Sequence, residues 1–281
     1  MITLAAHAKI NLFLQVIGKR EDGYHEIDSL MQSVSLRDRV KLTKTEAEIK
    51  LMISDPNLPI DERNTAYKAA LLFFDKTGIK DGVEIEIEKN IPVAAGLAGG
   101  SADAAAVLIG LNQLFKTKLN ESDLSVLGAG VGSDVPFCTV GGTCRCRGRG
   151  EVVERLEPLL DTWLVLVKPD FQIKTRWVYE NFDRVWIKEK RLVGTHQPLA
   201  GLTLYNDLEK VVLPKHPKVN EIKKRLIQLG CLQAIMTGSG PAVFGLARDG
   251  KNAQQVFQEI KKEYPLSFVA QTVNSGVVPA R

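Results

Sequence analysis

The sequence has no uninterrupted apolar segment long enough to cross a membrane. The nearest approach, residues 91–111, contains Ser101 and Asp103, and half of it is glycine and alanine. It therefore reads better as a glycine turn that leads into a buried helix. Residues 1–9 also lack the basic region and following apolar stretch of a signal peptide. We expect a cytoplasmic protein with no membrane partner.

Cysteine is scarce. The four cysteines are Cys138, Cys144, Cys146 and Cys231. The close spacing of Cys144 and Cys146 could begin a metal site, but no second Cys or His pair stands at metal-ligand spacing to complete it. We therefore expect four ordinary reduced thiols.

A strong excess of one charge is also absent. Lys and Arg number 37 against 33 Asp and Glu, and the basic residues are scattered rather than gathered into an arm or stripe. This pattern argues against a nucleic-acid partner and suits a protein that handles phosphorylated metabolites. The 281 residues, 44% hydrophobic and 25% charged, suffice for a sizeable core in one large domain or two smaller ones.

Apolar periodicity predicts both strands and helices. Residues 83–89 alternate apolar and charged side chains, as in a strand with one buried face, and residues 102–115 are rich in Ala and Leu, as in a buried helix. We expect an α+β fold of two lobes with a ligand between them. Further helices are predicted over residues 65–76, capped by Asn64 and closed by Gly78, from Asn120 to about 129, and over 219–229 and 253–262; further strands are predicted over 163–167, 242–246 and 268–273.

The most informative segment is the turn Pro92-Val-Ala-Ala-Gly-Leu-Ala-Gly-Gly-Ser101, which lies between the predicted strand and helix. Glycines allow backbone N–H groups to approach an anion, and the helix that follows presents unpaired N–H groups and a positive dipole end to phosphate. The turn lacks the Gly-Lys-Ser/Thr of a Walker A loop and the spacing of a dinucleotide fingerprint. It indicates a triphosphate site of another kind; taken alone, it could also be a flexible turn before a helix.

Two other segments carry isolated charged residues. Residues 8–14 form an apolar strand pattern that contains Lys9 and Asn11, and residues 130–137 form a Gly- and Pro-punctuated segment, predicted as a loop, that contains Asp134. Each has an ordinary interpretation, because a lone Lys in a strand usually reaches solvent and a lone Asp before Val-Pro usually belongs to a turn.

These three segments occur in this order together with Thr237-Gly-Ser-Gly-Pro-Ala-Val-Phe near the end of the chain. In this combination the sequence resembles the GHMP-superfamily kinases, which transfer the γ-phosphoryl group of ATP to a small-molecule hydroxyl. The resemblance implies a ribosomal-S5-like N-terminal lobe over residues 1–155 and a ferredoxin-like α+β C-terminal lobe over residues 156–281. It also implies that Asp134 is the catalytic base and Lys9 its cationic partner.

The resemblance further assigns the nucleotide site. Asn64 and Lys89 match positions near the adenosine. Mg²⁺ is expected to bridge the β- and γ-phosphates, with Ser101 as the candidate protein oxygen. The residues expected to hold ATP in the turn are Pro92, Val93, Ala94, Ala95, Gly96, Leu97, Ala98, Gly99, Gly100, Ser101 and Ala102. Asp103 stands where some members have Asn, and its role is left open.

The segment Asp22-Gly-Tyr-His25 resembles one branch of the superfamily. That branch phosphorylates the 2-hydroxyl of a cytidylyl-methylerythritol in non-mevalonate isoprenoid biosynthesis. The resemblance implies that Asn11, Tyr24 and His25 hold the cytidine and phosphate part of the substrate, and that Tyr179, in a later matching segment with Thr175, lies against the cytosine. Because cytosine has a flat face and a hydrogen-bonding edge, we expect Tyr24 and Tyr179 to stack on it and His25 to read the edge. Two alternatives remain open: another GHMP kinase, acting on homoserine, mevalonate or a sugar, and a non-catalytic S5-like module that binds nucleotide or RNA. No oligomeric state is predicted.

Overall fold

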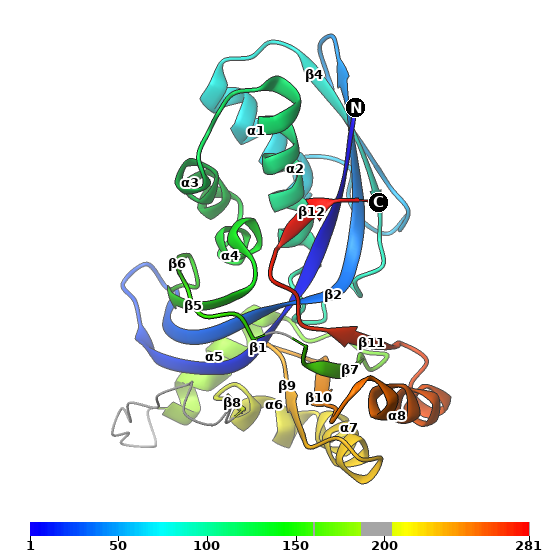
Figure 1. The fold of residues 1–281 in the computed structure, drawn as a ribbon. Coiled ribbons are helices and arrows are strands. Elements are labelled where there is room, and N and C mark those ends of the chain that lie inside the picture. Colours follow the sequence, from blue (N-terminus) through cyan, green and yellow to red (C-terminus); the bar gives the residue numbers. More distant parts are fainter. Residues whose placement is uncertain (160, 187–203, 281) are drawn as a thin grey trace.

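The computed structural model describes residues 1–159, 161–186 and 204–280 (Figure 1). Within these residues the chain forms one sheet of eight strands and one of four, each covered by helices. The two sheets lie in different parts of the molecule. One cluster of buried apolar side chains joins the larger sheet and its helices to one face of the smaller sheet, and a second cluster lies on the other face of the smaller sheet. The predicted two-lobed α+β fold is confirmed.

The larger sheet is built on a long antiparallel hairpin of β1 (Ile2–Lys19) and β2 (His25–Thr45). The predicted strand at residues 83–89 is confirmed as β4 (Gly82–Glu88), in which Val83, Ile85 and Ile87 are buried. The neighbouring strands of the larger sheet follow the order β12-β1-β2-β4-β3. In addition, β5 pairs with β2 and β6, and β8 pairs with β1. The remaining strands of this sheet are β3 (Ile49–Ile53), β5 (Thr143–Gly148), β6 (Val152–Arg155), β8 (Tyr205–Asn206) and β12 (Val277–Pro279).

Helices α1 to α4 lie together on one side of this sheet (Figure 1). They are α1 (Thr65–Thr77), α2 (Gly99–Phe115), α3 (Glu121–Val131) and α4 (Val135–Val140). The caps predicted for α1 are confirmed, because the Asn64 side chain accepts a hydrogen bond from the Ala66 N–H and Gly78 has a left-handed φ of 68°. The central helix α2 is so rich in alanine that it packs closely on α1, β1 and β2.

Two expectations for this region need correction. Helix α2 begins at Gly99, three residues before the predicted start, because the glycines continue the turn directly into the helix. The segment 130–137 is not one loop, since α3 extends to Val131 and α4 begins at Val135. Pro136 stands in the first turn of α4, where its missing N–H and fixed φ are tolerated, so it helps to start this helix.

The smaller sheet has the antiparallel order β11-β7-β10-β9. With α7 between β7 and β9, and α8 between β10 and β11, this is the strand order 4-1-3-2 of a ferredoxin-like βαββαβ unit. Its strands are β7 (Trp163–Val167), β9 (Gln233–Met236), β10 (Val243–Leu246) and β11 (Ser267–Gln271), and its helices are α5 (Thr175–Trp186), α6 (Glu209–Lys215), α7 (Pro217–Gln228) and α8 (Gly250–Glu263).

The larger sheet also contains strands from the last third of the chain. Strands β8 and β12 follow residue 155 in sequence but pair with β1 of the larger sheet. The lobe boundary between residues 155 and 156 therefore stays a prediction. None of the helices in the described ranges is long and apolar enough to span a membrane. The four cysteines are buried and no disulfide joins them, as predicted.

Candidate active site

A cavity of about 1100 Å³ lies between the two lobes. Its lining combines β1, the turn before α2, the residues between α3 and α4, one face of α5 and the loop after β9. Nearly every candidate site residue lines it, although these residues are scattered from Lys9 to Tyr179 in the sequence. Ala102 does not: it is fully buried in α2, and its N–H is already donated to the Ala98 carbonyl.

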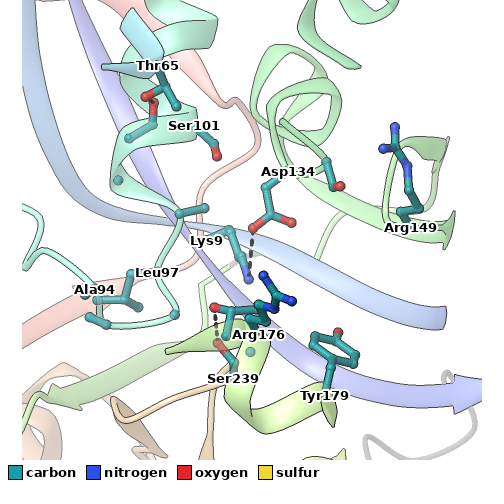
Figure 2. Close-up of a pocket in the computed structure, with 18 of the residues that line it drawn as sticks. Lys9, Thr65, Ala94, Leu97, Ser101, Asp134, Arg149, Arg176, Tyr179 and Ser239 are labelled. Carbon is teal, nitrogen blue, oxygen red and sulfur yellow. Dashed lines mark hydrogen bonds and ion pairs between the residues drawn. The ribbon is translucent and has the colours of Figure 1, made fainter. Parts of the chain in front are cut away.

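Lys9 and Asp134 both line the cavity, and their charged groups point toward each other (Figure 2). The Lys9 ammonium lies 3.6 Å from a carboxylate oxygen of Asp134 and donates a 2.7 Å hydrogen bond to Asn11 Oδ1. Lys9 is only 3% exposed, so its charge is held in place, whereas a third of the Asp134 side chain remains open. A fixed cation beside an accessible carboxylate can compensate a phosphoryl charge while the carboxylate accepts a hydroxyl proton.

Asn11 connects this pair to both lobes. Its side-chain amide donates to Ser29 Oγ on β2 at 2.8 Å, and its backbone N–H donates to Thr237 Oγ1 at 3.0 Å. Thr237 precedes Gly238, where an added Cβ would stand 3.3 Å from the Lys9 ammonium. The loop of the smaller lobe therefore packs directly on the charged pair, and both lobes are needed to shape the site.

The turn before α2 presents the start of that helix to the cavity. Its backbone has left-handed φ angles at Ala94, Gly96 and Ala98. Hydrogen bonds hold it on both sides, from the Lys9 N–H to the Leu97 carbonyl and from the Ala242 N–H to the Ala95 carbonyl. The N-terminal N–H groups and the positive dipole end of α2 thus face the cavity, an arrangement suited to phosphate.

Gly96 is the position in this turn most sensitive to substitution. Its φ is 80°, and an added Cβ would lie 2.4 Å from the Thr237 carbonyl oxygen. We expect Gly96→Ala to raise the KM for ATP by at least about tenfold, because the strain and the backbone clash displace the turn that is predicted to hold the phosphates. Steady-state kinetics at saturating acceptor concentration measures this effect.

Gly78→Ala is the matched control for this prediction. Gly78 also has a left-handed φ, 68°, but an added Cβ would meet no atom within 4 Å, and the residue does not line the cavity. It should lower stability by about 1 kcal/mol without affecting the KM for ATP. Equal KM values for the two variants would show that the contact between Gly96 and Thr237 does not position the turn.

Lys89 lines the cavity, but its ammonium is directed into the protein. It donates to Asp38 Oδ2 and, at 2.6 Å, to Asp103 Oδ2. Asp38 is fully buried and also accepts hydrogen bonds from the Asn90 and Ile91 N–H groups, directly before the glycine turn. This cluster of Lys89, Asp38 and Asp103 therefore anchors the start of the turn. Since the Lys89 ammonium is bonded to these two acids, its contact with the adenosine stays a prediction.

Asp103 carries an unusual charge environment. Burial, opposed by the Lys89 ammonium, raises the pKa of its carboxyl to about 8. Its Oδ1 is buried with no hydrogen-bond partner among the described residues. Burial would lower the pKa of Lys89, but the interactions with Asp103 and Asp38 raise it above its usual value, so the ammonium stays charged.

Asn64 lines the cavity with its side chain already engaged. Its Oδ1 accepts from the Ala66 N–H, and its Nδ2 donates to the Pro59 carbonyl, both at 2.9 Å. Any contact with the adenosine would use the second amide hydrogen or the second oxygen lone pair. The side chain is therefore rigid, whatever it binds.

The opposite part of the cavity is aromatic. The His25 ring stacks on Tyr179 with 4.8 Å between centroids, and its Nε2 lies 2.6 Å from Asp183 Oδ1. Tyr24 is half exposed at the cavity surface, with the Arg149 guanidinium 4.9 Å from its ring centre. Burial, reinforced by the Asp134 charge, raises the pKa of Tyr179, so its hydroxyl stays neutral.

One face of α5 supplies much of this aromatic part. Thr175, Tyr179 and Asp183 follow one another at intervals of four residues, which places them on the same side of the helix. The Thr175 hydroxyl lies 2.8 Å from Ser239 Oγ. Thr175 and Tyr179 were predicted here from the sequence. Asp183 was not, although its spacing from Tyr179 could have revealed it. Ser239 belongs to the segment 237–244 noted in the sequence, but no role was predicted for it, and Arg149 carried no comparable signal.

Known proteins are similar to this chain over nearly its whole length. Residues 64–142 match the GHMP kinases N terminal domain, and residues 189–266 match the GHMP kinases C terminal domain. A 4-diphosphocytidyl-2-C-methyl-D-erythritol kinase of Clostridium tetani is 44% identical over 278 residues, which cover 96% of this chain and 99% of that protein. The chain belongs to the GHMP kinase family.

Other relatives agree with this placement. The kinase of the same name from Moorella thermoacetica is 44% identical, with 97% of this chain and 99% of that protein covered. The crystal structure of a 4-(cytidine 5'-diphospho)-2C-methyl-D-erythritol kinase is 32% identical and has a TM-score of 0.82, covering 96% of this chain and 99% of the other. A homoserine kinase from Cytophaga hutchinsonii, 21% identical with a TM-score of 0.77 and coverage of 99% and 97%, shares the fold alone.

As a GHMP kinase, the chain is an ATP-dependent kinase, which confirms the predicted enzyme class and the nucleotide. The alternative of a non-catalytic S5-like module is thereby set aside. The roles of the individual side chains around ATP and the acceptor stay predictions, for which the geometry above provides tests.

Proposed function

We propose that this GHMP kinase transfers the γ-phosphoryl group of ATP to the 2-hydroxyl of 4-diphosphocytidyl-2-C-methyl-D-erythritol. The products would be the 2-phosphate and ADP, in non-mevalonate isoprenoid biosynthesis. Relatives that match this chain over nearly its whole length, at 41–44% identity, carry the name of this kinase. The observation in the molecule that carries the proposal is that one cavity is lined by the glycine turn at the start of α2, by the charged pair Lys9 and Asp134, and by an aromatic surface.

The order of these features fits the two substrates. Figure 2 displays Lys9 and Asp134 between Ser101, at the start of α2, and Tyr179 on α5. ATP would place its phosphates at the turn, and the acceptor would place its cytosine near His25 and Tyr179. The reacting hydroxyl and the γ-phosphate would then meet beside Lys9 and Asp134, which is the positioning that phosphoryl transfer most requires.

The two charged residues would have separate roles. Phosphoryl transfer passes through a loose transition state, so the base need only orient the hydroxyl and take its proton late. Asp134 would accept that proton. Lys9, held by Asn11, would stabilise the negative charge on the transferring phosphoryl group without any change of position.

Mg²⁺ would be held chiefly by the phosphate oxygens of ATP. Among the described residues, no three His, Cys, Asp or Glu side chains are grouped so that they could hold a metal ion. Mg²⁺ commonly takes one or two protein oxygens and completes its shell with phosphates and water. Ser101, which lines the cavity in the first turn of α2, would supply such an oxygen. The ion would neutralise part of the negative charge of the ATP phosphates.

A panel of acceptors tests the proposal. ADP release is measured with ATP, Mg²⁺ and, in turn, the cytidylyl acceptor, homoserine, mevalonate and a hexose, with the reaction lacking an acceptor as background. We expect turnover above background only with the cytidylyl acceptor, because a small polar acceptor has no base for the His25 and Tyr179 surface to bind. Turnover with homoserine or mevalonate alone would contradict the assignment.

A further inference from the structure

Asp183 is the one acidic side chain in contact with the His25 ring among the described residues. It reaches His25 Nε2 at 2.6 Å from α5, 158 residues away in the sequence. Lys19 donates to the other carboxylate oxygen, also at 2.6 Å. His25 is 8% exposed, and its ring is held from the side by Tyr179. The imidazole is therefore fixed in orientation by two residues of the same helix, one turn apart.

The carboxylate determines which ring nitrogen carries the proton. Partial burial would raise the pKa of Asp183, but hydrogen bonds from His25 and Lys19 lower it below its usual value, so the group is ionised near neutral pH. An ionised carboxylate only accepts hydrogen bonds, so Nε2 must carry the hydrogen that it shares with Asp183. In neutral His25 the other nitrogen, Nδ1, is then a hydrogen-bond acceptor. Nδ1 has no hydrogen bond to the described residues, and His25 lines the cavity.

We propose that Asp183 is a positioning residue that fixes the Nε2–H tautomer of His25 and thereby makes the site select cytosine over uracil. This inference rests on the proposed function, because it concerns the base of the proposed acceptor. Cytosine offers an amino group at position 4, which can donate to Nδ1. Uracil offers a carbonyl oxygen there, which would face the Nδ1 lone pair with no hydrogen between them.

The same geometry explains why a carboxylate is needed at this position. An Asn side chain could present its NH₂ group to Nε2 and so stabilise the opposite tautomer, with the hydrogen on Nδ1. That hydrogen would oppose the amino group of cytosine and match the carbonyl of uracil. A buried site that pairs a donor with an acceptor rejects the mismatched base strongly, since the mismatch leaves polar groups unpaired.

The test compares Asp183→Asn with the wild-type kinase, using the cytidylyl acceptor and its uridylyl analogue. We expect the variant to raise the KM for the cytidylyl acceptor by about 30-fold, an effect typical of losing a buried polar partner. The KM for ATP and the kcat at saturation should stay within about threefold, since Asp183 contacts neither the turn nor Asp134. The preference for cytidylyl over uridylyl should fall by at least about tenfold.

Two further variants separate positioning from general damage. Asp183→Glu keeps a carboxylate and should retain most of the preference for cytosine. Glu263→Gln makes the same chemical change in an exposed ion pair with Arg225, away from the cavity, and should leave every constant unchanged. An unchanged base preference in Asp183→Asn, or an equal rise in the KM values for ATP and the acceptor, would overturn the proposal.

The tautomer can also be observed directly. The sequence contains four histidines, and ¹⁵N chemical shifts of the ring nitrogens, assigned with a His25→Gln variant, report which nitrogen carries the hydrogen. We expect the Nε2–H form in wild-type protein at a pH where His25 is neutral. The Nδ1–H form there would overturn the proposal even if Asp183→Asn does not fold. Failure of the wild-type kinase to phosphorylate the cytidylyl acceptor would instead refute the proposed function, and the tautomer measurement would still stand.

Discussion

Asp134→Asn is expected to reduce kcat by about 10³-fold, within the range that a positioned general base contributes. The amide has nearly the same shape, and its oxygen can occupy the place of the carboxylate oxygen that lies 3.6 Å from the Lys9 ammonium, so the site should keep its form. It cannot take up the hydroxyl proton. The KM for ATP should change little, because Asp134 stands at the start of α4 and is not part of the glycine turn, and in Figure 2 it is Lys9 that lies toward Ala94 and Leu97 of that turn. Steady-state turnover and nucleotide binding by calorimetry measure the two effects separately.

The same Asp-to-Asn substitution at an exposed position away from the cavity is the control for Asp134→Asn. Asp75 is exposed on α1 and does not line the cavity, so Asp75→Asn removes the same charge without touching the site. Its kcat should equal that of the wild-type enzyme. If Asp134→Asn retains turnover within tenfold, a barrier change of about 1.4 kcal/mol, Asp134 is not the base, and Lys9 together with positioning would account for the rate.

Lys89→Met is expected to lower the free energy of unfolding by about 3–5 kcal/mol, the usual cost of removing one member of a buried ion cluster. The substitution leaves Asp38 and Asp103 buried beside each other without their shared cation. Because Asp38 also holds the backbone that enters the glycine turn, the KM for ATP should rise as well. Urea denaturation measures the stability change, and kinetics measures the second effect.

Lys41→Met is the matched control for this prediction. Lys41 pairs with Glu86 across β2 and β4 of the same sheet, but both side chains are more than one-third exposed. Such a pair contributes about 1 kcal/mol or less, so the control should remain nearly as stable as the wild type. Asp103→Asn should also lower the free energy of unfolding by less than Lys89→Met, because Lys89 still keeps Asp38 as its partner. Similar losses for both lysine variants would show that burial does not govern the cluster.

Local features of the fold could be predicted because short stretches of sequence encode them. The alternation at residues 83–89, the Asn64 cap and the glycine turn each depend on neighbouring residues, and each occurs as predicted. The errors occurred where a local signal has two meanings. Pro136 was interpreted as a sign of a loop, but proline is also well tolerated in the first turn of a helix, where the structure places it.

The family resemblance extended the prediction to the site itself. Lys9, Asp134, His25 and Tyr179 were all expected to lie together, and the structure places them around one cavity. What the resemblance did not provide was the set of partners that hold these residues. Asp183 on His25 and Thr237 on Asn11 were not foreseen.

By itself, then, the sequence determined the strand, glycine turn and helix of the predicted triphosphate site, because the backbone conformation of that unit depends on residues next to one another. Only the tertiary structure decided how the site is held. Asp38 meets Lys89 across 51 residues, Asp183 meets His25 across 158, and Thr237 meets Asn11 across 226. Such contacts form when sheets and helices pack, and no periodicity within one segment encodes which distant side chain will arrive. The turn therefore predicts a phosphate site, whereas the packing of the two lobes determines which charged and polar side chains line the cavity beside it.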